Sequence, residues 1–92
     1  MTARELFAKF NDDDFLKFED IEYPLSHLRD LTAFMMLAPY ATHDIIGWSE
    51  HDEYGLNVDV DKLDGLPPEF IKDLLRCGVI FSEEHDSLQL FA

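Results

Sequence analysis

IIGWSEHDEYGLNVDV, residues 45–60, is the stretch that decides the fold, because here the spacing of apolar residues changes from helical to alternating. From Tyr54 to Asp61 every second residue is apolar, which is typical of a half-buried strand with one wet face. The apolar run Ile45–Ser49 predicts a partner strand, and the polar link at 50–53 predicts the turn between them. The stretch therefore predicts a β-hairpin with an acidic outer face.

A second hairpin is predicted near the end of the sequence. The apolar runs Val79–Phe81 and Leu88–Phe91 flank a polar link at 82–87. The tripeptide Glu-His-Asp occurs in both predicted turns, at 50–52 and again at 84–86. Duplication of a hairpin unit and chance recurrence of turn-forming residues are both open explanations.

Helix signals precede and separate the hairpins. Thr2 and Glu5 have the spacing of a capping box and predict a first short helix that ends at Asn11. The acidic segment 12–22 predicts at most a second helical turn, capped by an Asp. Pro67-Pro68 predicts the start of another helix, and Gly78 lies where a left-handed helix cap is expected.

The clearest helical pattern begins at Pro24 and stops at Pro39. Apolar residues recur at helical spacing and spread beyond one face, so this helix is predicted to be central and buried. The members of the stripe are Leu25, Leu28, Leu31, Phe34 and Met35. We therefore expect a single α+β domain over residues 1–92, with three or four helices packed on a small antiparallel sheet made of two hairpins.

The charge balance is strongly acidic, although the composition is that of a folding chain. There are 20 Asp and Glu against 7 Lys and Arg, a formal net charge of -13 over 92 residues. Acidic disordered tails are poor in apolar and aromatic residues, whereas 47% of this chain is hydrophobic and 8 residues are Phe. The chain is expected to form a compact domain with a negative shell.

Such a shell argues against direct binding to nucleic acid or to anionic membranes. Phosphate contacts need clustered cations, and the Lys and Arg residues here are dispersed along the chain.

The N-terminal residues lack the pattern of a signal peptide, and the longest apolar run, 33–40, is too short to span a bilayer. We expect a cytoplasmic protein, in the host cytoplasm if it is phage-encoded.

Catalytic and metal-binding motifs are weak. Cys77, the single cysteine, falls at the end of a predicted helix, where a thiol is better suited to core packing than to nucleophilic chemistry. His-Asp pairs at 43–44, 51–52 and 85–86 would form a metal site only if the two hairpin tips met. The acids after Asp59 do not match the positions of a calcium loop. We expect no enzyme activity, no metal and no cofactor.

The acidic clusters are the best candidates for a binding surface. Carboxylates on a rigid scaffold steer the approach of a basic partner, and neighbouring aromatic residues supply lasting contacts. Tyr23, which follows Glu22, and Tyr40, four residues before Asp44, are weighed as further anchors. The predicted partner-binding residues are Asp12, Asp13, Asp14, Glu19, Asp20, Glu22, Trp48, Glu50, Asp52, Glu53, Tyr54, Asp59, Asp61, Glu83, Glu84 and Asp86.

These features favour a non-enzymatic inhibitor that binds the basic nucleic-acid-binding surface of a protein or complex. In size and charge, though in no motif, the chain resembles small phage-encoded antagonists of host defence, of the anti-CRISPR or anti-restriction type. The alternatives are an immunity protein or antitoxin that neutralises a nuclease toxin, and a small acidic adaptor subunit. The chain is expected to be a monomer or a homodimer, and acidity that serves only solubility is the competing explanation.

Self-repulsion of the negative charge predicts that salt stabilises the fold. The melting temperature should rise between about 10 mM and about 0.5 M NaCl, because screening shortens the range of like-charge repulsion. Circular dichroism melts measure this, with an uncharged osmolyte at equal osmolality as the control. A melting temperature that is flat or falls with salt would contradict the prediction.

Overall fold

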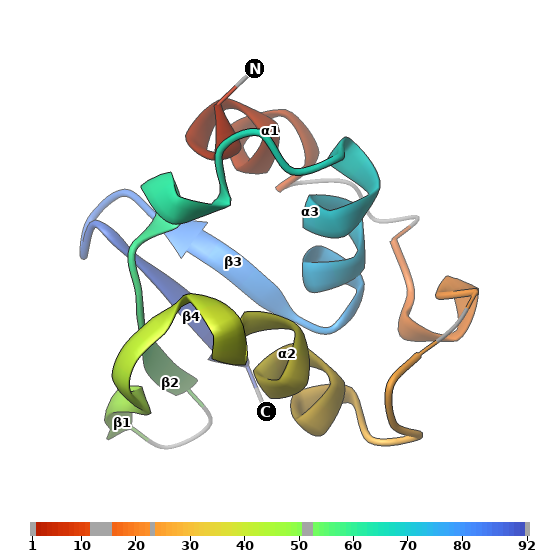
Figure 1. Cartoon of the computed structure of the whole chain (residues 1–92), viewed down its shortest axis with the longest axis horizontal. Helices are drawn as coiled ribbons and strands as arrows, with labels where there is room; N and C mark the ends of the chain where they lie inside the picture. The colour runs from red at the N-terminus through yellow and green to blue at the C-terminus, as the bar shows by residue number, and fades with distance from the viewer. Residues whose placement is uncertain (1, 12–15, 23, 51–52, 92) are drawn as a thin grey trace.

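The computed structural model describes residues 2–11, 16–22, 24–50 and 53–91 (Figure 1), and at positions 42, 43 and 50 it describes the backbone alone. Within these ranges the chain forms three α-helices and one four-stranded antiparallel sheet, in agreement with the predicted α+β class. The helices are α1 (Ala3–Phe10), α2 (Arg29–Leu37) and α3 (Pro68–Arg76), and the strands are β1 (Ala41–Glu50), β2 (Glu53–Val58), β3 (Val79–Ser82) and β4 (Ser87–Phe91). Three short 3₁₀ turns are η1 (Phe18–Asp20), η2 (Ala38–Tyr40) and η3 (Val60–Leu63).

The sheet consists of the two predicted hairpins joined side by side. Its strand order is β1-β2-β4-β3, so the inner strand of each hairpin pairs with the inner strand of the other. Tyr54 lies opposite Leu90 and Leu56 lies opposite Leu88 in this central pairing. The alternation along β2 and β4 thereby turns one apolar face of both hairpins toward the core.

The core lies between that face and the helices. Helices α1 and α3 contact each other and β3, while α2 contacts β1. In Figure 1 the helices surround β3, with α1 above it, α3 to its right and α2 below it. The largest fully buried apolar side chains are Phe7, Leu37, Leu63, Ile71, Leu74, Leu88, Leu90 and Val79.

Several local predictions are confirmed. Thr2 and Glu5 form both hydrogen bonds of a capping box, and Asn11 ends α1. Pro68 opens α3, and Gly78 adopts a φ of 92° after its end. A Cβ at Gly78 would also lie 3.2 Å from the carbonyl oxygen of Phe91, so both backbone conformation and space favour glycine there.

The predicted start of the second helix at Pro24 is wrong, because α2 begins at Arg29. The Ser26 amide donates to Thr32 Oγ1 at 3.2 Å, and that hydroxyl donates to the Ser26 carbonyl at 2.9 Å. The Leu28 amide donates to Ser26 Oγ at 3.1 Å. These side-chain bonds satisfy the backbone outside the helix, as Ser and Thr commonly do at helix entries.

The prediction that this helix is central and buried is also wrong. Its buried residues are Thr32, Ala33 and Leu37, whereas Leu31 is 42% exposed and Met35 is 45% exposed. The helix rests on its narrow side, where the small residues Thr32 and Ala33 allow close approach. Four members of the predicted stripe, Leu25, Leu28, Leu31 and Met35, consequently stay exposed, while Phe34 packs against the core.

Three smaller differences concern element ends. The first strand is longer than predicted, and its pairing with β2 shifts register between Ala41 and Ile46 and again between Ile46 and Trp48. The second strand ends at Val58, two residues earlier than predicted. The chain turns there into η3, because the Asp59 side chain accepts a hydrogen bond from the Asp61 amide and caps that turn. Val60 is buried within η3. The turn η1 has Lys17 at its cap position, with no side-chain cap, where an Asp was expected.

A pair of leucines tests the orientation of α2. Leu37→Ala should lower the free energy of unfolding by about 2–5 kcal/mol, because it leaves a cavity in the core. Leu31→Ala should change it by no more than about 0.5 kcal/mol, because that side chain is largely solvent-exposed. Urea unfolding followed by circular dichroism measures both. Equal losses in the two variants would mean that the stripe is buried after all.

Candidate partner-binding surface

Two acidic segments that are distant in the sequence meet at Arg4 of α1. The Arg4 Nε donates to Asp61 Oδ1 at 2.9 Å, and one terminal nitrogen donates to Asp86 Oδ1 at 2.6 Å. These hydrogen bonds, first that to Asp61 and then that to Asp86, hold the pKa of Arg4 above its ordinary value. The side chains of Asp61 and Asp86 nevertheless stay 57% and 70% exposed, so a partner can reach both carboxylates.

The segment 59–64 is also fixed by two contacts between side-chain carboxylates and backbone amides. Asp64 Oδ1 accepts from the Ala3 amide at 2.7 Å and so satisfies a free donor at the start of α1. Asp59 Oδ1 accepts from the Asp61 amide at 3.0 Å. Residues 59–64 are therefore held against the N-terminus of α1 by carboxylates that also supply negative charge.

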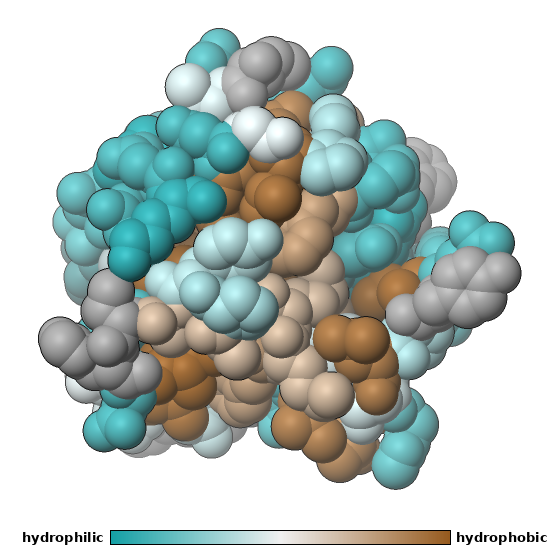
Figure 2. Space-filling model, in the orientation of Figure 1, coloured by the Kyte–Doolittle hydropathy of each residue, from teal (hydrophilic) through white to brown (hydrophobic). Residues whose placement is uncertain are grey.

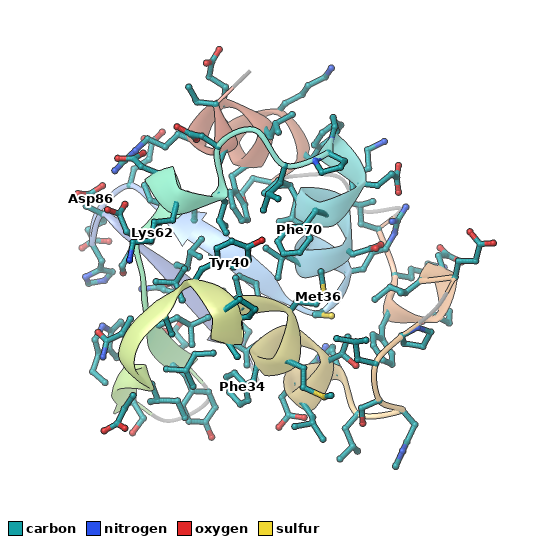
Figure 3. The ribbon with its side chains drawn as sticks, in the orientation of Figure 1. Phe34, Met36, Tyr40, Lys62, Phe70 and Asp86 are labelled. Atoms are coloured by element: carbon teal, nitrogen blue, oxygen red, sulfur yellow. The ribbon has the colours of Figure 1, made fainter. Side chains whose placement is uncertain are left out.

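We call this surface the acidic flank. It comprises Asp59, Asp61, Asp64, Glu83, Glu84 and Asp86, with Arg4 and Lys62 as its cations. Six carboxylates against two cations leave an excess of four negative charges. Lys62 and Asp86 lie at the same edge of the molecule in Figure 3.

A shallow hollow of ≈ 410 Å³ lies within the acidic flank. Asp59, Lys62 and Asp86 line it, together with Asn57, Ser87 and the apolar residues Leu56 and Val58. Ser87 Oγ is buried and has no hydrogen-bond partner. The hollow offers a basic side chain the two carboxylates of Asp59 and Asp86.

The predicted acids Glu19, Asp20 and Glu22 lie elsewhere. Asp20 and Glu22 border a separate hollow of ≈ 310 Å³ beside α3. Figure 1 shows η1 on the side of the molecule opposite the β3–β4 turn. The predicted clusters thus form at least two surfaces rather than one.

The surface beside α3 is partly neutralised. Arg76 donates to Glu69 Oε2 at 3.1 Å and to Asp73 Oδ1 at 2.6 Å. The hydrogen bond from Arg76 holds the pKa of Glu69 below its ordinary value. Arg76 pairs with two acids here, as Arg4 does in the acidic flank. The acidic flank is the stronger candidate for binding a basic partner because it gathers six carboxylates from two distant segments against two cations.

Several predicted residues cannot be placed on either surface. Asp12, Asp13, Asp14 and Asp52 lie outside the described residues, as does Tyr23, and the side chain of Glu50 is not described. Glu53 is half-buried and pairs with Glu50 across the first hairpin. The prediction for these acids stays open.

The predicted aromatic anchors occupy different environments. Trp48 is 36% exposed, and its ring lies 5.7 Å from that of His85. Tyr54 is half-buried and packs against the core, so it has less surface to offer a partner. Tyr40 makes an edge-to-face contact with Phe70 at 6.0 Å, which Figure 3 shows near the centre of the molecule.

Trp48 also covers Gly55 on the neighbouring strand. A Cβ at Gly55 would lie 2.0 Å from Trp48 Nε1, so only glycine allows the indole to lie flat against β2. This contact positions Trp48 beside the β3–β4 turn, close to the acidic flank. The sequence shows both residues but not the register that brings them together.

The register keeps the two hairpin ends apart. Glu53, at the end of the first hairpin, pairs with Phe91, whereas Leu56 pairs with Leu88 near the turn of the second. A metal site shared between both tips would require these ends to meet. In the part of the chain that the structure describes, no three His, Cys, Asp or Glu residues are grouped so that they could hold a metal ion.

Cys77 lies in the core at the end of α3 and is fully buried. Burial raises the pKa of its thiol to about 12, with a further contribution from Asp73. The thiolate form that a nucleophile requires is therefore disfavoured at neutral pH. This position suits packing rather than catalysis.

The apolar surface around α2 is the feature that sequence reasoning missed. Leu25, Leu28, Leu31, Met35 and Ile46 are all more than a third exposed. Figure 2 shows brown and tan apolar surface running down the middle of this face, with hydrophilic surface on both sides. The small residues Thr32 and Ala33 on the opposite side of α2 were the available signal.

No protein-family model matches the chain, and no curated protein or solved structure shows significant similarity to it. None of the helices described is long and apolar enough to cross a membrane.

The contact between Trp48 and Gly55 generates a direct test. Gly55→Ala should displace the indole, shift the fluorescence of this single tryptophan to the red, and cost about 1–3 kcal/mol through overpacking. Glu19→Ala, a change at an exposed side chain of η1, is the control and should leave the spectrum unchanged. An unaltered spectrum and stability in Gly55→Ala would show that Trp48 does not cover this glycine.

Proposed function

We propose that this chain is a non-enzymatic inhibitor that binds the basic, nucleic-acid-binding surface of another protein through its acidic flank. The observation that supports this is the convergence of residues 59–64 and 83–86 on Arg4, which leaves a local excess of carboxylates. A surface of one charge sign raises the encounter rate with an oppositely charged partner.

Asp61, Asp64 and Asp86 are also ordered before a partner binds. Arg4 holds Asp61 and Asp86 on one guanidinium, and Asp64 is held by the Ala3 amide. Side chains that are already positioned lose less conformational freedom when a partner binds. An ordered group of carboxylates imitates a group of phosphates better than a set of mobile side chains does.

The contacts of the flank's carboxylates and of the Cys77 thiol are better suited to binding than to catalysis. The acids of the flank form ion pairs and cap backbone amides, and the single thiol is buried with a raised pKa. A small acidic inhibitor of this kind suits a phage-encoded antagonist of host defence, of the anti-CRISPR or anti-restriction type.

The exposed apolar surface favours one alternative, an immunity protein or antitoxin for a nuclease toxin. Apolar side chains such as Leu31 and Met35 can hold a partner outside its nucleic-acid groove. A competitor of nucleic acid should be displaced from its target by DNA or RNA. An immunity protein that binds outside the groove should stop cleavage and leave nucleic-acid binding intact.

The partner is sought by affinity capture with the tagged chain from nuclease-treated lysate of its source cells, with elution by a salt step. Capture of a basic nucleic-acid-handling protein that added DNA or RNA displaces would support the proposal. Capture that is insensitive to both salt and nucleic acid would contradict it, since neither charge nor the nucleic-acid site would then be involved.

Charge reversal on the flank tests the surface once the partner is in hand. Glu83→Lys/Glu84→Lys should lower the association rate constant on the order of tenfold at low salt, with a smaller effect at high salt. Surface plasmon resonance at several salt concentrations measures the rate. Glu19→Lys/Asp20→Lys carries the same change in charge on the other surface and is the control. Equal effects of the two variants would show that overall charge, and not the flank, governs association.

A further inference from the structure

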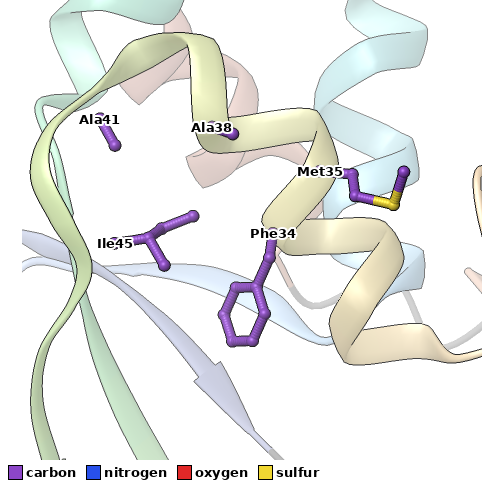
Figure 4. A pocket seen from close by; sticks show the side chains of 5 residues that line it. All are labelled: Phe34, Met35, Ala38, Ala41 and Ile45. Atoms are coloured by element: carbon purple, nitrogen blue, oxygen red, sulfur yellow. The ribbon is translucent and has the colours of Figure 1, made fainter.

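A groove lined by apolar side chains lies between α2 and β1. Phe34, Met35, Ala38, Ala41 and Ile45 line an open groove of ≈ 320 Å³, at the lower end of the size of ligand pockets. Figure 4 shows Ile45 projecting from β1 toward Phe34, with Ala38 and Ala41 closing one end. The groove therefore has the volume for a few bulky side chains and not for a large cofactor.

One rim of the groove continues into an exposed apolar ridge. Leu28, Leu31 and Met35 recur at helical spacing and are 48%, 42% and 45% exposed. Phe34 and Ile45 are half-buried within the groove. The groove thus has a half-buried apolar centre and an exposed apolar rim. This arrangement is typical of a docking site, since large exposed apolar patches mark interaction surfaces.

Two exposed carboxylates lie near groove residues in the chain. Asp30 precedes Phe34 by one helical turn, and Asp44 directly precedes Ile45; both are exposed. The nearest cation on α2, Arg29, is directed to the Phe91 carbonyl oxygen at 3.3 Å. No charged residue lines the groove among the described residues.

The charge of the chain favours a basic segment over a second copy of this chain as the ligand of the groove. A second copy would bring another formal charge of -13 and the same acidic border to the contact. A basic segment with an apolar stripe would meet complementary charge at the border and apolar side chains at the centre. Helices that dock in apolar grooves do so with anchors at i, i+3, i+4 and i+7.

We propose that the groove between α2 and β1 binds a basic amphipathic helix of the partner protein. The proposal deepens the proposed function and rests on it for the basic character of the partner. Apolar anchors of the helix enter the groove between Phe34 and Ile45, and its Lys or Arg side chains lie near Asp30 and Asp44. The groove supplies lasting affinity, while the acidic flank supplies the rate of encounter.

The test uses a defined probe rather than the partner. It is a fluorescein-labelled peptide of two heptads, with leucine at helical spacing and lysine elsewhere, and the same residues in scrambled order serve as its control. Fluorescence anisotropy measures the Kd for the folded full-length chain. We expect the ordered peptide to bind at least about tenfold more tightly than the scrambled one, since only the ordered one presents its anchors together.

Variants of the chain locate the site. Ala38→Phe fills the groove and should raise the Kd at least about tenfold, while Ala8→Phe, the same change at an exposed site on α1, should not. Met35→Gln removes apolar surface at the exposed rim and covers the case in which Ala38→Phe fails to fold. Asp30→Asn/Asp44→Asn should weaken binding at low salt and have little effect at high salt.

Three results would overturn the proposal. The first is equal binding of both peptides. The second is no effect of Ala38→Phe and Met35→Gln. The third is sedimentation of the chain as a dimer that Ala38→Phe dissociates, which would make a second copy the occupant.

The two proposals fail separately. Failure of the peptide test leaves partner capture through the acidic flank standing. Peptide binding that depends on Ala38, together with partner capture that ignores the flank and nucleic acid, would refute only the proposed function.

Discussion

The pairing of β2 with β4 is the interaction on which the rest of the structure depends. It joins two hairpins that would each be marginal alone, because an isolated hairpin buries too little apolar surface. With Leu56 opposite Leu88 and Tyr54 opposite Leu90, the apolar faces of both hairpins become one wall of the core. The same register places the turn at 83–86 where Arg4 can bind Asp86 as well as Asp61.

A chain with this excess of carboxylates must limit repulsion wherever its folded state concentrates them. Arg4 does so at one point by lying between two acids, and the amide of Ala3 does so at another by donating to Asp64. These contacts leave the carboxylates exposed while fixing their positions. Reduced repulsion and an exposed, ordered group of carboxylates are thus two results of one arrangement.

Local signals in the sequence predicted local structure well. The capping box at Thr2 and Glu5, the left-handed Gly78 and both hairpins are present, because each depends on residues close together in the chain. The orientation of α2 was not predictable from periodicity, since its stripe is apolar enough to face either the core or a partner. The meeting of Asp61 and Asp86 at Arg4 also depends on strand register, which no local pattern specifies.

The irregular pairing of β1 has a consequence for solubility. Both edges of a sheet expose unpaired amides and carbonyls that invite strands from other molecules. Along β1 the register shifts on either side of Ile46, and β3 spans only Val79–Ser82. Bulged or short edges are poor templates for intermolecular pairing. The molecule can therefore display an apolar groove beside β1 without offering a straight edge on which fibrils would grow.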